Sequence, residues 1–165
     1  MSASEGSTRS RKPPPDGGST SEGDPRNTIR THLRFGWWSL LVFLMLGLVL
    51  EGMHGFKVGF YLDVANEARR LMWRLAHAHG TLLSLVNIAF ALTVGVIRHW
   101  PGPSRLVASR CLRAGTLLVP GGFFLGGVVV YDGDPGLGVA LVPVGAILLI
   151  VAVFLTARRL RTLNA

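Results

Sequence analysis

Residues 35–53, FGWWSLLVFLMLGLVLEGM, form an apolar run that contains no charged residue before Glu51. A helix that crosses the roughly 30 Å hydrocarbon core of a bilayer needs about 20 predominantly apolar residues. The run has this length, and it is continuously apolar, without the alternation that is typical of a membrane β-strand. It therefore predicts a transmembrane helix.

Three further runs of the same kind follow along the chain, at residues 75–97, 111–131 and 136–157. So few polar residues remain that four such helices could not be covered as the core of a soluble protein. We therefore expect an all-α fold, an integral membrane four-helix bundle formed by residues 29–165.

The composition and the placement of charge agree with this fold. Of the 165 residues, 49% are hydrophobic and 16% are charged, whereas soluble domains carry about a quarter charged residues. The net charge is +8, and 13 of the 17 Lys and Arg residues lie before residue 35, in the 98–113 connection or after residue 157. The positive-inside rule then predicts both termini on the cytoplasmic side of a bacterial inner (plasma) membrane. Because topology explains the charge, we expect the lipid bilayer as a partner and no nucleic acid.

Residues 1–28 differ from the rest of the chain, because they are rich in Ser, Pro, Gly and mixed charges. Such a segment cannot bury enough apolar surface to offset the entropy of ordering it, and we predict a disordered polar tail. A secretory signal peptide is not expected, since no small-residue cleavage site follows a short apolar core.

Candidate ligands gather near the predicted outer side. Glu51 and His54 are three residues apart at the end of the first run, so they share one side of a helix. His77 and His79 lie at the start of the 75–97 run. Imidazole nitrogens with a carboxylate suit transition metals, and one or two histidines can hold a haem. These four residues are our candidate metal site, and His77 and His79 are the candidate haem ligands.

The spacing of the two histidines separates them on a straight helix, by about 200°. Both can reach one ion only if the helix is disturbed at Gly80. His77 continues a polar stripe with Arg70 and Arg74, at the spacing i, i+4, i+7. The alternative for each histidine is a hydrogen-bonded anchor at the membrane interface. For Glu51, the alternative role is that of a solvated residue at the end of the helix or a partner of Arg74 in an ion pair.

Small and amide side chains indicate how the helices pack. Asn87 lies near the middle of its run, within a stripe of small residues, and predicts an interhelical hydrogen bond. The glycines of the 111–131 and 136–157 runs predict close helix packing. Between these runs, the sequence around Asp132 and Asp134 predicts a turn. We assign the two remaining histidines to the basic fringe on the inner side: His32 and His99.

Residues 73–85, WRLAHAHGTLLSL, resemble the helix that bears a haem-ligating histidine in the haem-copper oxidase and nitric oxide reductase superfamily. They are also similar to small, uncharacterised four-helix bacterial membrane families that have an upstream Glu and an H-x-H motif. The resemblance implies that His77 or His79 is an axial haem ligand. It does not extend to a complete oxidase core, because the later spans carry no second set of histidines.

Three functional hypotheses follow. The leading one is a small inner-membrane protein with a transition-metal or haem site at its outer face. The first alternative is a non-catalytic structural or assembly subunit, which packs against other membrane subunits or its own copy through the helices at 111–131 and 136–157. The second is a small transporter component that uses Asn87 and a kink in the helix at 111–131. The sequence contains no P-loop and no G-x-S-x-G motif, and it identifies neither catalytic residues nor a substrate.

Overall fold

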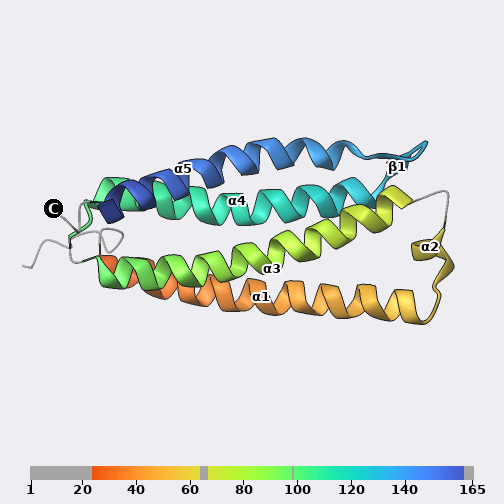
Figure 1. Ribbon diagram of the computed structural model, residues 1–165, viewed down its shortest axis with the longest axis horizontal. Helices are drawn as coiled ribbons and strands as arrows, with labels where there is room; N and C mark the ends of the chain where they lie inside the picture. Colours follow the sequence, from red (N-terminus) through yellow and green to blue (C-terminus); the bar gives the residue numbers. More distant parts are fainter. Residues whose placement is uncertain (1–23, 64–66, 98, 162–165) are drawn as a thin grey trace, which may run out of the picture.

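Four long helices make up most of the computed structural model, which describes residues 24–63, 67–97 and 99–161 (Figure 1). In chain order they are α1 (Pro25–Gly55), α3 (Glu67–Val96), α4 (Gly102–Val128) and α5 (Leu141–Arg161). The predicted all-α four-helix bundle is confirmed.

Short elements connect the long helices at one end of the bundle. The helical turn α2 (Gly59–Leu62) follows α1. The strands β1 (Val130–Tyr131) and β2 (Asp134–Pro135) form a hairpin, and the 3₁₀ helix η3 (Leu137–Ala140) leads into α5. Asp132 and Gly133 have positive φ angles of 46° and 90°, as a tight hairpin turn requires. The predicted turn is therefore confirmed. Helix α4 ends at Val128, before the end of the predicted run at residue 131.

Helix α1 begins well before its apolar run. Asp24 caps it, because its side chain accepts a hydrogen bond from the backbone N–H of Arg26 at 2.9 Å. Pro25 occupies the first helical turn, where its missing N–H costs nothing. Thr28 is already buried, so the helix includes the last residues of the segment that we assigned to the tail. Residues 1–23 lie outside the described part of the chain.

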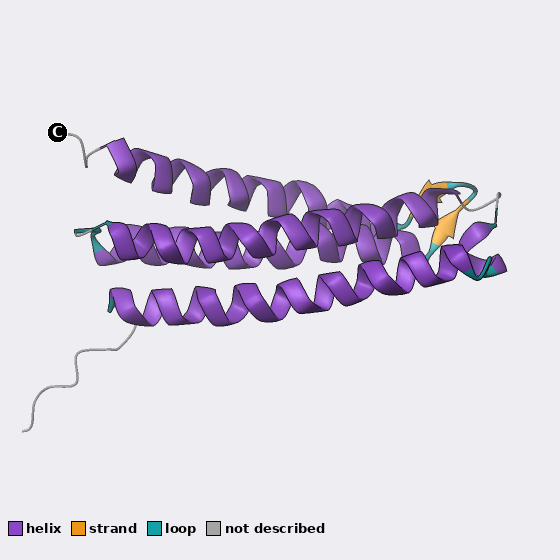
Figure 2. Ribbon diagram, turned by 60° about the horizontal axis from the view of Figure 1, so that its bottom comes forward, coloured by secondary structure: helices purple, strands orange, loops and turns teal. Residues whose placement is uncertain are grey.

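The helices lie side by side in the order α1, α3, α4, α5, so α1 and α5 form the two edges (Figures 1 and 2). In the most apolar stretches of α3 and α4, 39% and 44% of the residues are buried, against 11% in α1 and in α5. The outward faces of the edge helices expose large apolar side chains, among them Leu48 on α1 and Ile150 on α5. All four helices are long and apolar enough to cross a membrane. The chain thus has the architecture of a multi-pass membrane protein, and its orientation stays a prediction.

Glycines allow the neighbouring helices to approach closely. A Cβ atom at Gly36 or Gly47 of α1 would collide with α3, and one at Gly80 of α3 would overlap the ring of Phe43. Gly122 of α4 faces Val142 and the carbonyl oxygen of Gly138. The expected close packing of the glycine-rich helices is therefore found within this chain.

Substitution of Gly122 tests this packing. A Cβ there would lie 2.9 Å from Val142 Cγ2 and 3.1 Å from the Gly138 oxygen. We expect Gly122→Leu to lower the free energy of unfolding by about 1–3 kcal/mol through overpacking, measured by circular dichroism during thermal unfolding in detergent. Gly121→Leu is the matched control, because nothing lies within 4 Å of a Cβ at Gly121, and Leu favours a helix more than Gly. An equal loss in both variants would contradict the packing.

Candidate functional site

A cleft of about 1250 Å³ lies between α1 and α3, near the end of the bundle where α2 is found. Leucine side chains from both helices supply its apolar walls. Its polar lining comes from the last two turns of α1 and the first three of α3: Glu51, His54, Arg70, Arg74 and His77. We call this space the α1–α3 cleft. It brings together three of the four candidate ligands, and His79 does not line it.

His77 is held in a fixed orientation within the cleft. Its Nδ1 lies 2.8 Å from the carbonyl oxygen of Phe43 on α1. Since a carbonyl oxygen only accepts, Nδ1 carries a proton, and in the neutral imidazole Nε2 keeps its lone pair. The imidazole ring lies against Gly47, where any side chain would displace it. An Nδ1–H bonded to a backbone carbonyl is the arrangement that orients a metal-ligating histidine.

His79 lies on a different flank of α3, as the two-residue spacing predicted. Its Nδ1 donates to the carbonyl oxygen of Leu75, one turn earlier on the same helix, at 2.9 Å. Its ring packs at 5.0 Å, centre to centre, from the ring of Phe123 on α4. Helix α3 runs without interruption through Gly80, so the disturbance that could aim both histidines at one ion does not occur.

Glu51 and His54 lie in the last turns of α1, and both are exposed. Among the described residues, Glu51 forms no ion pair, so the alternative of a Glu51–Arg74 pair is not observed. Within the same described ranges, no three His, Cys, Asp or Glu side chains gather closely enough to hold one metal ion. Within the described ranges, the four candidate residues therefore do not form a cluster of three or more protein ligands.

Two arginines of α3 supply cationic groups to the cleft. Arg70 pairs with Glu67, one turn away, at 3.2 Å. Arg74 is exposed, one turn from His77 on the same stripe of α3. Because Glu67 already neutralises Arg70, Arg74 is the guanidinium of the cleft lining that can pair with an anionic group on a ligand.

An aromatic cluster fixes the segment beside the cleft. Arg69 donates from Nε to the carbonyl oxygen of Gly127, and its guanidinium lies 4.1 Å from the ring centre of Phe60. Trp73 stacks on Tyr61 and donates to a backbone carbonyl of α4. Tyr61, only 3% exposed, also lines the cleft. No pattern in the sequence predicted this contact of Trp73 with α2.

A second polar cluster, completely buried, lies toward the opposite end of the bundle. Asn87 Oδ1 accepts a hydrogen bond from His32 Nδ1 at 2.8 Å, and Asn87 Nδ2 donates to Thr116 Oγ1 at 2.8 Å. Ser109 Oγ lies 2.8 Å from His32 Nε2, which makes the hydroxyl the donor. The predicted interhelical bond of Asn87 is confirmed, and it joins α1, α3 and α4.

His32 corrects one of our sequence predictions. We placed it in the basic fringe, but it is 0% exposed and packs at 4.6 Å, centre to centre, from the ring of Phe90. Its neighbours Arg30 and Arg34 suggested a solvated segment. The signal that could have identified it is the helical spacing His32, Gly36, Ser39, Phe43, Gly47, which marks the face of α1 that meets α3.

The cluster has the order of a nucleophile, a base and an orienting group, because Ser109, His32 and Asn87 form a hydrogen-bonded chain. All three side chains are at most 4% exposed. Neither the α1–α3 cleft nor the cavity between α3 and α5 has any of them in its lining. We therefore assign the cluster to holding three helices together.

Removal of the His32 imidazole should be costly. His32→Ala leaves a cavity and the unpaired oxygens of Asn87 and Ser109, so we expect a loss of about 3 kcal/mol in unfolding free energy. Urea or thermal unfolding in detergent micelles measures it. His99→Ala, at an exposed histidine, is the control and should stay within about 0.5 kcal/mol. A stable His32→Ala variant would refute the structural role.

Comparisons of the chain with family models, with curated proteins and with solved structures gave no match.

Proposed function

We propose that this multi-pass membrane protein binds a haem in the α1–α3 cleft, where the imidazole of His77 would hold the iron. The observation that supports the proposal is the oriented imidazole of His77, which lines a large cleft with apolar walls and two arginines. A haem matches these features, because its iron takes an imidazole nitrogen and its propionates pair with cations. Bound there, it would supply one-electron chemistry or a site for a small gaseous ligand.

The shape of the cleft suits a large, mostly apolar ligand. Its walls include Leu44 and Leu48 of α1 and Leu71 and Leu75 of α3. Its volume of about 1250 Å³ exceeds the range of about 300–1,000 Å³ that is usual for ligand pockets. Small ions would leave most of this space unused, whereas a tetrapyrrole would cover the leucine side chains.

Residues that suggested the other hypotheses make contacts within this chain. Gly122 and Gly126 belong to the helices that we considered for contact with a partner, and they pack against residues 136–142 of the same chain. Asn87, which we considered for a transported substrate, has both polar atoms engaged inside the bundle. Neither alternative has a specific contact in its favour.

A haem titration with matched histidine variants tests the proposal. Purified wild-type protein, in detergent, should bind added haemin with one-to-one stoichiometry and a shifted Soret band. His77→Ala should lose the shift, because the imidazole nitrogen that would hold the iron is missing. His79→Ala should keep it, since His79 faces Phe123.

Circular dichroism establishes that each variant is folded before its titration. A folded wild-type protein without saturable binding would overturn the proposal. Equal binding by the His77→Ala and wild-type proteins would do the same.

The arginines should contribute affinity through the propionates. Arg74→Gln should weaken haemin binding by about two- to fivefold, the factor that corresponds to one exposed ion pair. The difference should shrink at high ionic strength, because salt screens exposed charges. Lys57→Gln removes the same charge from the same end of the bundle, outside the cleft lining, and should bind as the wild type does. A salt-independent effect at Arg74 would contradict this role.

A further inference from the structure

The end of the bundle opposite α2 carries a concentration of positive charge. There α1 begins, α4 begins and α5 ends (Figure 1). The described residues of this end include one acidic residue, Asp24, whose carboxylate caps α1. Against it stand nine arginines: Arg26, Arg30, Arg34, Arg105, Arg110, Arg113, Arg158, Arg159 and Arg161. We call this the basic end.

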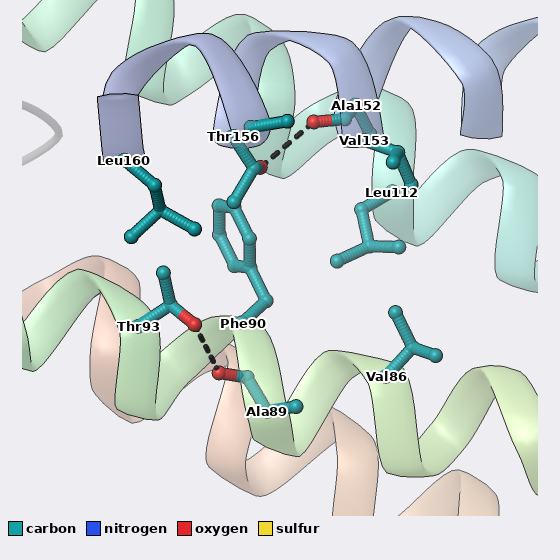
Figure 3. Close-up of a pocket in the computed structure, with 10 residues that line it drawn as sticks. Val86, Ala89, Phe90, Thr93, Leu112, Ala152, Val153, Thr156 and Leu160 are labelled. Carbon is teal, nitrogen blue, oxygen red and sulfur yellow. Dashed lines mark hydrogen bonds between the residues drawn. The ribbon is translucent and has the colours of Figure 1, made fainter. Parts of the chain in front are cut away.

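An apolar groove of about 240 Å³ lies between α3 and α5 in the same half of the bundle. Leu112 of α4 also lines it, and Phe90 of α3 projects toward α5 (Figure 3). It exists because α5 packs on α4 and diverges from the other helices toward its C-terminus (Figure 2). We call this space the α3–α5 groove.

The chemistry of the groove favours hydrocarbon. The two hydroxyl groups in its lining belong to Thr93 and Thr156, and each donates to a carbonyl of its own helix, at 2.9 and 2.8 Å. The remaining lining is aliphatic or aromatic. A polar ligand would lose its hydration here without gaining hydrogen bonds, whereas an acyl chain would not.

The groove runs toward the basic end. Its lining on α5 includes Val153, Ala157 and Leu160. One further step of four residues from Ala157 reaches Arg161, which is exposed in the last turn of α5. On α5, the apolar groove therefore extends toward a helix end that carries the exposed Arg161.

We propose that the α3–α5 groove is a binding site for an anionic phospholipid. One acyl chain fills the groove, and the phosphate group pairs with Arg161 at its end. Basic sites between membrane helices bind anionic lipid head groups in this manner. The site is separate from the α1–α3 cleft, and its occupancy does not depend on haem.

Photo-crosslinking in bilayer nanodiscs tests the site. The full chain is reconstituted in phosphatidylcholine with a minor fraction of a probe lipid, either phosphatidylglycerol or phosphatidylcholine with a diazirine in its acyl chain. Crosslinked residues are mapped by mass spectrometry. We expect crosslinks to concentrate on residues 86–93 and 153–160, and the phosphatidylglycerol probe to exceed the phosphatidylcholine probe by roughly fivefold.

Two pairs of variants separate the groove from general lipid contact. Ala157→Phe fills the groove at an exposed position and should abolish these crosslinks, whereas Val144→Phe, on another face of α5, should keep them. Arg161→Gln should remove most of the preference for phosphatidylglycerol. Arg34→Gln, which removes the same charge from the far edge helix, should retain it.

Three results would overturn the proposal. The first is an even spread of crosslinks over the apolar surface, and the second is equal labelling by the two probes. The third is labelling of the groove that persists in Ala157→Phe. Circular dichroism of each variant before reconstitution ensures that a loss of crosslinks reflects the groove and not unfolding.

Discussion

The hydrogen bond between His32 and Asn87 is the constraint on which the arrangement of α1 and α3 depends. An imidazole and an amide inside an apolar bundle are costly unless they find partners. His32 Nδ1 donates a hydrogen bond to Asn87 Oδ1 at 2.8 Å. Ser109 and Thr116 of α4 form hydrogen bonds with the remaining polar atoms, His32 Nε2 and Asn87 Nδ2. One rotation and one register of α1 against α3 allow this pairing.

That register continues along the whole α1–α3 interface. Beyond the His32–Asn87 pair, Ser84 donates to Ser39, and then the ring of His77 meets Gly47. Because α1 and α3 are antiparallel, the same register places the end of α1 beside the start of α3. The cleft and the buried cluster are therefore two ends of one interface, and a slip of a single turn would move the ring of His77 away from Gly47.

The order of the helices explains the second site. In a row of four, the edge helices bury little of their surface, and α5 follows α4 without closing against α3. A closed bundle would have filled the α3–α5 groove with its own side chains. The open edge instead leaves an apolar space that ends among arginines, where a lipid chain and a phosphate group find matching surroundings.

The number of helices, their apolar character and the gathering of Glu51, His54 and His77 near one end were predictable from the sequence, because length, hydropathy and helical spacing are local properties. The separation of His79 from His77 followed from the same spacing. The burial of His32 was not predictable in this way, since its neighbours Arg30 and Arg34 suggested solvent. Only the tertiary structure decided which faces meet, because a hydrogen bond between residues 55 positions apart depends on the rotation and register of two helices, and no single helix encodes either.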